Sequence, residues 1–203
     1  MDETRNTLLL RGTALREPLY SHENHGQKFY RFPLSVRRLS GQDDILPVIT
    51  TEELLAPLLP LTGQRLAVEG QLRSFNNKSG TGSRLVISVF PHTLQPTHEE
   101  DYNLIQLTGI LCKPPILRRT PLGRCICDMM LAVNRRYGRA DYLPCIAWGQ
   151  IAMLTGEMGV GDTLTLEGRV QSRRYTKVLD GIASERTAYE VSIMHLPDPI
   201  LFP

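Results

Sequence analysis

The stretch Glu69-Gly70-Gln71-Leu72-Arg73-Ser74 returns as Glu167-Gly168-Arg169-Val170-Gln171-Ser172, a shift of 98 residues from 69 to 167. Asp44-Ile45-Leu46-Pro47 returns in the same way as Asp141-Tyr142-Leu143-Pro144, a shift of 97 residues from 44 to 141. Further pairs in the same order are Asn6 and Asn103, Leu10 and Leu107, Gly12 and Gly109, Leu34 and Leu131, and Val36 and Val133. Matches in one order at a nearly constant spacing indicate two copies of one domain.

The two copies, called repeat A and repeat B, are expected to occupy residues 1–97 and 98–203. The shift between matched positions grows again after residue 172, so we expect a longer insertion in repeat B beyond this point. Residues 91–101, PHTLQPTHEED, contain two prolines and an acidic run. This composition predicts a linker or an edge segment between the copies.

Each copy shows the two-residue period of β-strands. Phe32, Leu34 and Val36 alternate with polar residues or proline, and the same phase appears over residues 127–133 of repeat B. This alternation predicts a strand with one face on a core. The other strands are expected at 6–13, 45–50, 64–74 and 84–90 in repeat A and at 103–111, 142–148, 162–173 and 187–195 in repeat B.

One short helix fits between the third and fourth strands of each copy. In repeat A it is expected over residues 51–56, where Thr51 is the candidate N-cap and Glu52 and Glu53 lie in the first turn. In repeat B it is expected over residues 150–154. Five strands with a helix between the third and the fourth is the element order of the OB-fold. We therefore predict an all-β protein of two tandem OB-fold five-stranded barrels, each with one short helix between strands 3 and 4.

The composition excludes some classes of protein. The 203 residues carry a net charge of only +2, so the total charge says little about a nucleic-acid partner, and 41% are hydrophobic, which suits a packed core. The sequence has no apolar run of transmembrane length, and its first residues do not form a signal peptide. We expect a cytoplasmic protein that does not bind membranes and whose four cysteines are reduced.

The sequence has no motif for catalysis or for metal binding. Cys125 and Cys127 are separated by one residue, whereas zinc and redox pairs have a gap of two. The five histidines are scattered, and the glycines of residues 156–161 lack the Lys-Ser/Thr of a phosphate-binding loop. We predict that the protein is not an enzyme and uses neither a cofactor nor a metal.

Repeat B contains a series of stretches that occur together in one known family. They are NLIQLTG at 103–109, LAVNRRY at 131–137, DYLPCIAWG at 141–149, GDTLTLEGRVQSRRY at 161–175 and TAYEV at 187–191. With this series, repeat B resembles the OB domain of bacterial single-stranded DNA-binding proteins. Repeat A matches the family less well, and its assignment rests on its match to repeat B. Two OB domains in one chain resemble the fused arrangement of a few family members.

The resemblance implies where bases would stack. The stacking positions of the family fall on Tyr137, Tyr142, Trp148 and Tyr175 in repeat B, and all four are aromatic. In repeat A the equivalent positions hold Ser40, Ile45, Thr51 and Asn77, and none is aromatic. The resemblance therefore implies that repeat B carries the stacking and that repeat A has lost it or does something else.

The charged residues of repeat B support the same interpretation. A single strand offers a charged backbone and exposed bases, so a binder needs basic and aromatic side chains side by side. The basic residues expected to contact phosphates are Arg135, Arg136 and Arg139 around Tyr137, Arg173, Arg174 and Lys177 around Tyr175, and Arg119 in the first loop. Together these features predict sequence-independent binding of single-stranded DNA, in replication, recombination or repair.

Partners and alternatives follow from the same comparison. Family members work with four OB domains, so this two-domain chain is expected to form a homodimer. The sequence ends in PDPILFP at 197–203, without an acidic run, so we do not expect enzymes to be recruited through an acidic tail. Two alternatives stay open: a protein–protein module, such as a primosome-like or mobile-element accessory factor with weak nucleic-acid binding, and an RNA-binding OB protein.

Overall fold

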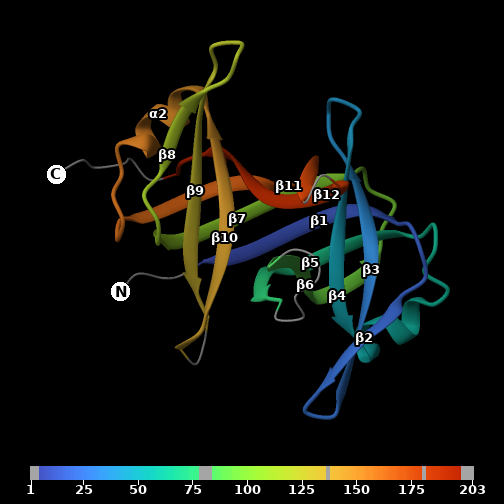
Figure 1. Ribbon diagram of the computed structural model, residues 1–203. Helices are drawn as coiled ribbons and strands as arrows, with labels where there is room; N and C mark the ends of the chain where they lie inside the picture. The colour runs from blue at the N-terminus through green and yellow to red at the C-terminus, as the bar shows by residue number, and fades with distance from the viewer. Residues whose placement is uncertain (1–4, 78–83, 136–137, 180–181, 198–203) are drawn as a thin grey trace.

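The protein consists almost entirely of β-strands arranged as two barrels (Figure 1). The computed structural model describes residues 5–77, 84–135, 138–179 and 182–197. Within them, the strands form one continuous sheet in the order β2-β3-β4-β6-β5-β1-β7-β11-β12-β10-β9-β8. The second half of this order mirrors the first, which confirms that the chain holds two copies of one fold.

Within the described residues, each repeat contains six strands of this sheet and one short α-helix. Repeat A contains β1 (Asn6–Ala14), β2 (Leu19–Asn24), β3 (Gln27–Arg37), β4 (Asp43–Thr51), α1 (Glu52–Leu55), the 3-10 turn η1 (Ala56–Leu58), β5 (Arg65–Asn76) and β6 (Leu85–Pro96). Repeat B contains β7 (Tyr102–Leu111), β8 (Ile116–Arg119), β9 (Cys125–Asn134), β10 (Ala140–Trp148), α2 (Gly149–Gly156), β11 (Thr163–Leu179) and β12 (Ile182–His195).

The predicted five-stranded barrels and their helices are confirmed, with one short strand added to each. The predicted strands of repeat A are β1, β3, β4, β5 and β6, and β4 and β6 pair in parallel through Val48 and Val89. The added strands β2 and β8 pair with β3 and β9. Both are exposed on both faces, so they show no alternation that a sequence pattern could reveal.

The predicted alternation places the cores correctly. Phe32, Leu34 and Val36 are all buried, and so are Leu131 and Val133 of repeat B. Thr51 is the N-cap of α1, as predicted, because its side chain accepts a hydrogen bond from the backbone N–H of Leu54 at 3.5 Å. Each barrel therefore closes over an apolar interior and leaves the other face of its strands to carry function.

Of the segment 91–101, predicted as a linker or an edge segment, residues up to Pro96 belong to β6 and pair with β5, so only the rest is a linker. Leu94 of this segment is buried, and Pro91 lies opposite Gly70 where the register shifts. A proline is tolerated at such a bulge because the ladder hydrogen bond is already interrupted there. A Cβ atom on Gly70 would lie 2.2 Å from the Phe90 carbonyl oxygen, so glycine is required at this close crossing. The connection between the repeats shrinks to 97–101.

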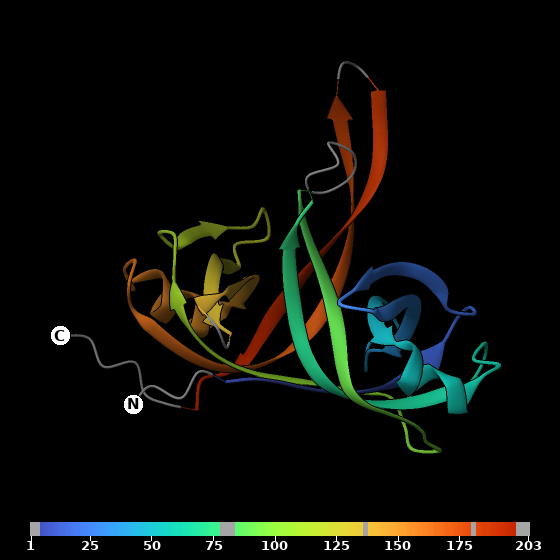
Figure 2. The ribbon, with the colours of Figure 1, turned by 90° about the horizontal axis from the view of Figure 1, so that it is seen from below.

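The extra length predicted in repeat B takes the form of a longer hairpin. β11 has 17 residues, whereas its counterpart β5 has 12. Its pairing with β12 continues out to Leu179 and Ile182. Figure 2 shows this hairpin, in orange and red, extending well beyond the barrels.

The two repeats meet through a local two-fold axis. β1 pairs antiparallel with β7, with Leu8 opposite Ile105. Asn6 lies opposite Leu107, and Leu10 lies opposite Asn103. Since Asn103 is the repeat B equivalent of Asn6 and Leu107 that of Leu10, exchanging the repeats leaves the pairing unchanged. Within the described residues, no helix is long and apolar enough to cross a membrane.

Candidate nucleic-acid interface

Two of the predicted stacking residues lie on one strand of repeat B. Tyr142 and Trp148 are 45% and 43% exposed, near the two ends of β10. Six residues separate them, so both side chains point to the same face, about 20 Å apart at ~3.3 Å per residue. Exposed rings of this size on a strand face are available to a partner.

The strand β11 adds a basic and aromatic pair. The Arg173 guanidinium lies 5.8 Å from the centre of the Tyr175 ring, which is a cation–π contact. Lys177 continues the same face two residues further on, and it is exposed. Arg174 points to the opposite face, where it lines a cleft of about 420 Å³ together with Ile45 of repeat A. The structure thus brings Arg173, Tyr175 and Lys177 together and separates Arg174 from them.

Acidic side chains offset part of the positive charge on this face. Glu190 lies opposite Gln171 on β12, and its carboxylate is 3.7 Å from Arg173 Nε. Burial raises the pKa of Glu190, an effect that nearby Arg173 partly reverses. On β9, Asp128 accepts a hydrogen bond from Arg118 Nε at 2.6 Å.

The remaining predicted cations lie at the edges of repeat B. Arg119 is exposed on the edge strand β8. Arg136 and Tyr137 lie outside the described residues. Arg139 is exposed just before β10, and it lines a hollow together with residues of repeat A.

Arg135 occupies a buried ion pair between the two repeats. Its Nε donates to Asp141 at 2.5 Å, its terminal nitrogen also bonds Asp141, and the same nitrogen donates to the Ser74 carbonyl of repeat A at 2.8 Å. The Asp141 side chain is only 1% exposed. It also accepts from the Ser74 backbone N–H at 2.5 Å. Arg135 therefore holds the repeats together, and a phosphate could reach it only in competition with Asp141.

The local two-fold axis repeats this arrangement in the other direction. Arg38 bonds Asp44 through two 2.6 Å contacts, and Asp44 accepts from the Ser172 backbone N–H at 2.7 Å. We call the two sets together the seam; its members are Arg38, Asp44, Ser74, Arg135, Asp141 and Ser172. The seam fixes the orientation of one barrel against the other, because each of its carboxylates bonds both repeats.

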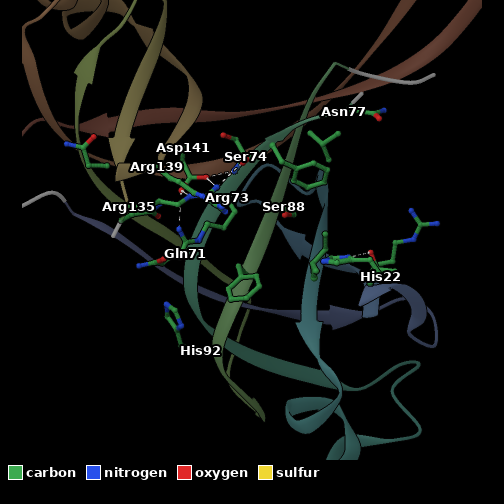
Figure 3. A pocket seen from close by; sticks show the side chains of 18 residues that line it. His22, Gln71, Arg73, Ser74, Asn77, Ser88, His92, Arg135, Arg139 and Asp141 are labelled. Atoms are coloured by element: carbon green, nitrogen blue, oxygen red, sulfur yellow. Dashed lines mark hydrogen bonds and ion pairs between the residues drawn. The ribbon is translucent and has the colours of Figure 1, made fainter. Parts of the chain in front are cut away.

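A groove of about 1780 Å³ lies on repeat A. It runs over β2, β3, β4, β5 and β6 and ends at the β9–β10 turn of repeat B. Its lining includes Arg31, Arg73, Arg135 and Arg139, and among the described residues Asp141 is the one acid in the lining. Figure 3 shows Arg135, Arg139 and Asp141 on one wall, with His22 across from them. We call this hollow the repeat A groove.

Sequence reasoning did not find the repeat A groove. Its rings are at positions other than the stacking positions of the family: Phe75 on β5, Phe90 and His92 on β6, and His22 on β2. The alternation of Arg73 and Phe75 along β5 was the one signal in the sequence. The contribution of Arg139 to the repeat A groove could not be predicted from the sequence of repeat B. It depends on the orientation of repeat B against repeat A, which the seam fixes.

Comparisons with known proteins agree with this architecture. Residues 102–197 match the Single-strand binding protein family. The Single-stranded DNA-binding protein B of Bacillus subtilis is 35% identical over 81 residues, which cover 36% of this chain and 72% of that protein. The Single-stranded DNA-binding protein 2 of Listeria innocua is 34% identical over 80 residues, which cover 36% of this chain and 50% of that protein. The chain thus spans about half the length of the first curated relatives that it matches.

A solved structure extends the likeness to both repeats. The wild-type single-stranded DNA binding protein from Thermus aquaticus superimposes with a TM-score of 0.78 at 24% identity. The superposition covers 99% of this chain and 96% of that one, so the fold is shared over its whole length. The identity of 35% to the Bacillus subtilis protein over 72% of its length, together with the match over residues 102–197, shows that the chain belongs to the single-strand binding protein family.

Proposed function

We propose that the chain binds single-stranded DNA, without catalysis and largely without regard to sequence, in DNA replication, recombination or repair. Bases stack on Tyr142, Trp148 and Tyr175, and phosphates pair with Arg173 and Lys177. The observation that carries this proposal is that Tyr142, Trp148, Arg173 and Lys177 are exposed on one side of the repeat B sheet, where the half-buried ring of Tyr175 contacts Arg173.

The chemistry favours a single strand over a duplex. Stacking a base on a ring contributes roughly 1–3 kcal/mol, and every base has a face to offer, so the interaction tolerates any sequence. In a duplex those faces are already stacked on one another. The guanidinium of Arg173 is planar, so it suits both a phosphate and an aromatic face.

The other predicted residues take different parts in the proposal. Arg119 and Arg174 are proposed to contact phosphates at the periphery of the site, because both side chains are exposed. Arg136 and Tyr137 remain predictions from the resemblance alone. Arg135 becomes a positioning residue, since its guanidinium is bonded to Asp141 and to Ser74.

The chain is further proposed to work as a homodimer with four OB barrels. The edge strand β8 and the helix α2 expose apolar side chains that such an interface could cover, namely Ile116, Leu117 and Met153. Light scattering at micromolar concentration should then give the mass of two chains, and the mass of one chain would exclude this assembly.

Fluorescence anisotropy with labelled oligo-dT tests the proposed binding. The double variant Tyr142→Ala/Tyr175→Ala should bind at least tenfold more weakly, because it loses two stacking platforms that each contribute ~1 kcal/mol or more. The matched control Tyr142→Phe/Tyr175→Phe keeps both rings and should bind like the wild type. Equal binding by all three proteins would remove the rings from the site. Binding to no oligonucleotide would favour a protein partner instead.

A further inference from the structure

Three rings that line the repeat A groove, those of His22, Phe90 and His92, are linked through the buried ring of Phe29. The His22 ring stacks on Phe29 with centroids 4.8 Å apart and planes 8° apart. Phe29 lies 6.1 Å from Phe90, and Phe90 lies 6.4 Å from His92, edge to face. Phe75, further along β5, is 48% exposed. Rings that are aligned along a groove offer successive faces to successive bases.

Basic side chains accompany these rings. The Arg73 guanidinium lies 5.8 Å from the centre of the Phe90 ring, and it also approaches Asp141 at 3.4 Å. Arg31 and Arg139 line the groove and are exposed. Of the four arginines in the lining, Arg73 and Arg135 share the carboxylate of Asp141, so the groove keeps a positive balance.

A position-by-position comparison with repeat B shows how differently the two faces are charged. Arg31 of the groove corresponds to Asp128, at a shift of 97 residues. Ser88 corresponds to Glu190, because Val89 and Val191 next to them hold the same place in the pairing of each last hairpin. Asp128 and Glu190 of the repeat B face are therefore replaced in repeat A, the first by a cation and the second by a neutral side chain.

The seam lies between the repeat B face and the repeat A groove. Tyr142 follows Asp141 directly, and its backbone N–H donates to Ser74 Oγ at 2.7 Å. Ser74 and Asp141 both line the groove. The backbone of β10 at Tyr142 therefore borders the wall of the groove, although the side chains of Tyr142 and Asp141 point to opposite faces of the strand.

From these observations we infer that the repeat A groove is a second binding site for the same single strand, with its own residues. Phe75, Phe90 and His22 take the bases, and Arg31, Arg73 and Arg139 take the phosphates. This inference rests on the proposed function of repeat B. It assigns a binding role to the repeat whose family stacking positions hold Ser40, Ile45, Thr51 and Asn77.

The test compares the wild type with Arg31→Glu/Phe75→Ala, two substitutions at exposed positions. Two oligo-dT lengths are used: about 10 nucleotides, enough for one OB fold, and about 30 nucleotides, enough for both. Anisotropy reports total binding, and the fluorescence of Trp148 reports repeat B. Arg31→Lys/Phe75→Tyr keeps ring and charge as the matched control, and Arg16→Glu makes the same charge change at an exposed position outside the groove lining.

The groove variant should bind the long oligonucleotide about tenfold more weakly and with a salt slope smaller by about 0.7. When the short oligonucleotide is added to the groove variant, the quenching of Trp148 fluorescence should equal that in the wild type. Both control proteins should bind the two oligonucleotides as the wild type does. Unchanged binding of the long oligonucleotide, or an equal loss in Arg16→Glu, overturns the inference while leaving the proposed function intact. If the wild type bound neither length, the proposed function itself would fail. Thermal unfolding of each variant shows that the fold is kept.

Discussion

The two repeats share a barrel and a seam but carry different side chains on their outer faces. Repeat B has its rings on β10 and β11, at Tyr142, Trp148 and Tyr175. Repeat A has its rings mainly on β5 and β6, at Phe75 and Phe90. The comparison teaches that an OB sheet can present rings and cations from different strands, so the loss of rings at one set of positions does not show a loss of binding.

The seam shows the opposite behaviour, because the same residue types recur at its equivalent positions. Arg38, Asp44 and Ser172 on one side match Arg135, Asp141 and Ser74 on the other. Each buried carboxylate bonds an arginine of its own repeat and a serine of the other. The shared residues thus hold the frame, and the divergent residues set what each face can bind.

The largest expected effect comes from breaking the seam on one side. Asp141→Ala leaves Arg135 and Arg73 without their shared carboxylate, so we expect the free energy of unfolding in urea to fall by about 3–5 kcal/mol. Asp128→Ala removes the more exposed pair with Arg118 and should cost less than about 1 kcal/mol. Similar losses in the two variants would contradict the structural role of the seam.

A smaller effect is expected from the acid that distinguishes the repeat B face. Because burial raises the pKa of Glu190, the folded protein binds its proton more tightly than the unfolded chain does, and ionisation costs stability as pH rises through the raised value. Glu190→Gln should therefore be more stable than the wild type at neutral pH, by on the order of 1 kcal/mol. This advantage should shrink as the pH falls from the raised value toward 4.5, the ordinary pKa of glutamate, and it should be absent below that pH.

Thermal unfolding over this pH range measures the difference. Glu185→Gln is the matched control, since the Glu185 side chain is 69% exposed, and its stability should stay close to that of the wild type. A wild type that is more stable than Glu190→Gln at neutral pH would mean that the contact with Arg173 outweighs the cost of burial.

Much of the fold could be predicted because it depends on local alternation. The burial of Phe32, Leu34 and Val36 and the cap at Thr51 follow from neighbouring residues alone. β2 could not be predicted, since a strand exposed on both faces is defined only by its pairing with β3. The end of β6 could not be predicted either, because Pro91 is tolerated there only through its pairing with Gly70 on the neighbouring strand β5.

The candidate site was harder to predict because it depends on contacts between distant segments. Arg135 looked like a phosphate contact until the fold brought Ser74 and Asp141 to it from two different repeats. His22 and Phe90 are far apart in the sequence, and only the closure of the barrel places them on one groove. The rings on β10 and β11 were predicted because the resemblance supplied their positions.

The fluorescence of Trp148, the one tryptophan of the chain, tests the central claim most directly. We predict strong quenching when the wild type is titrated with oligo-dT, weaker quenching at higher salt, and none with a duplex of equal length. Absence of quenching by oligo-dT, together with an unchanged anisotropy of the labelled oligonucleotide, would contradict the account of repeat B as the binding face.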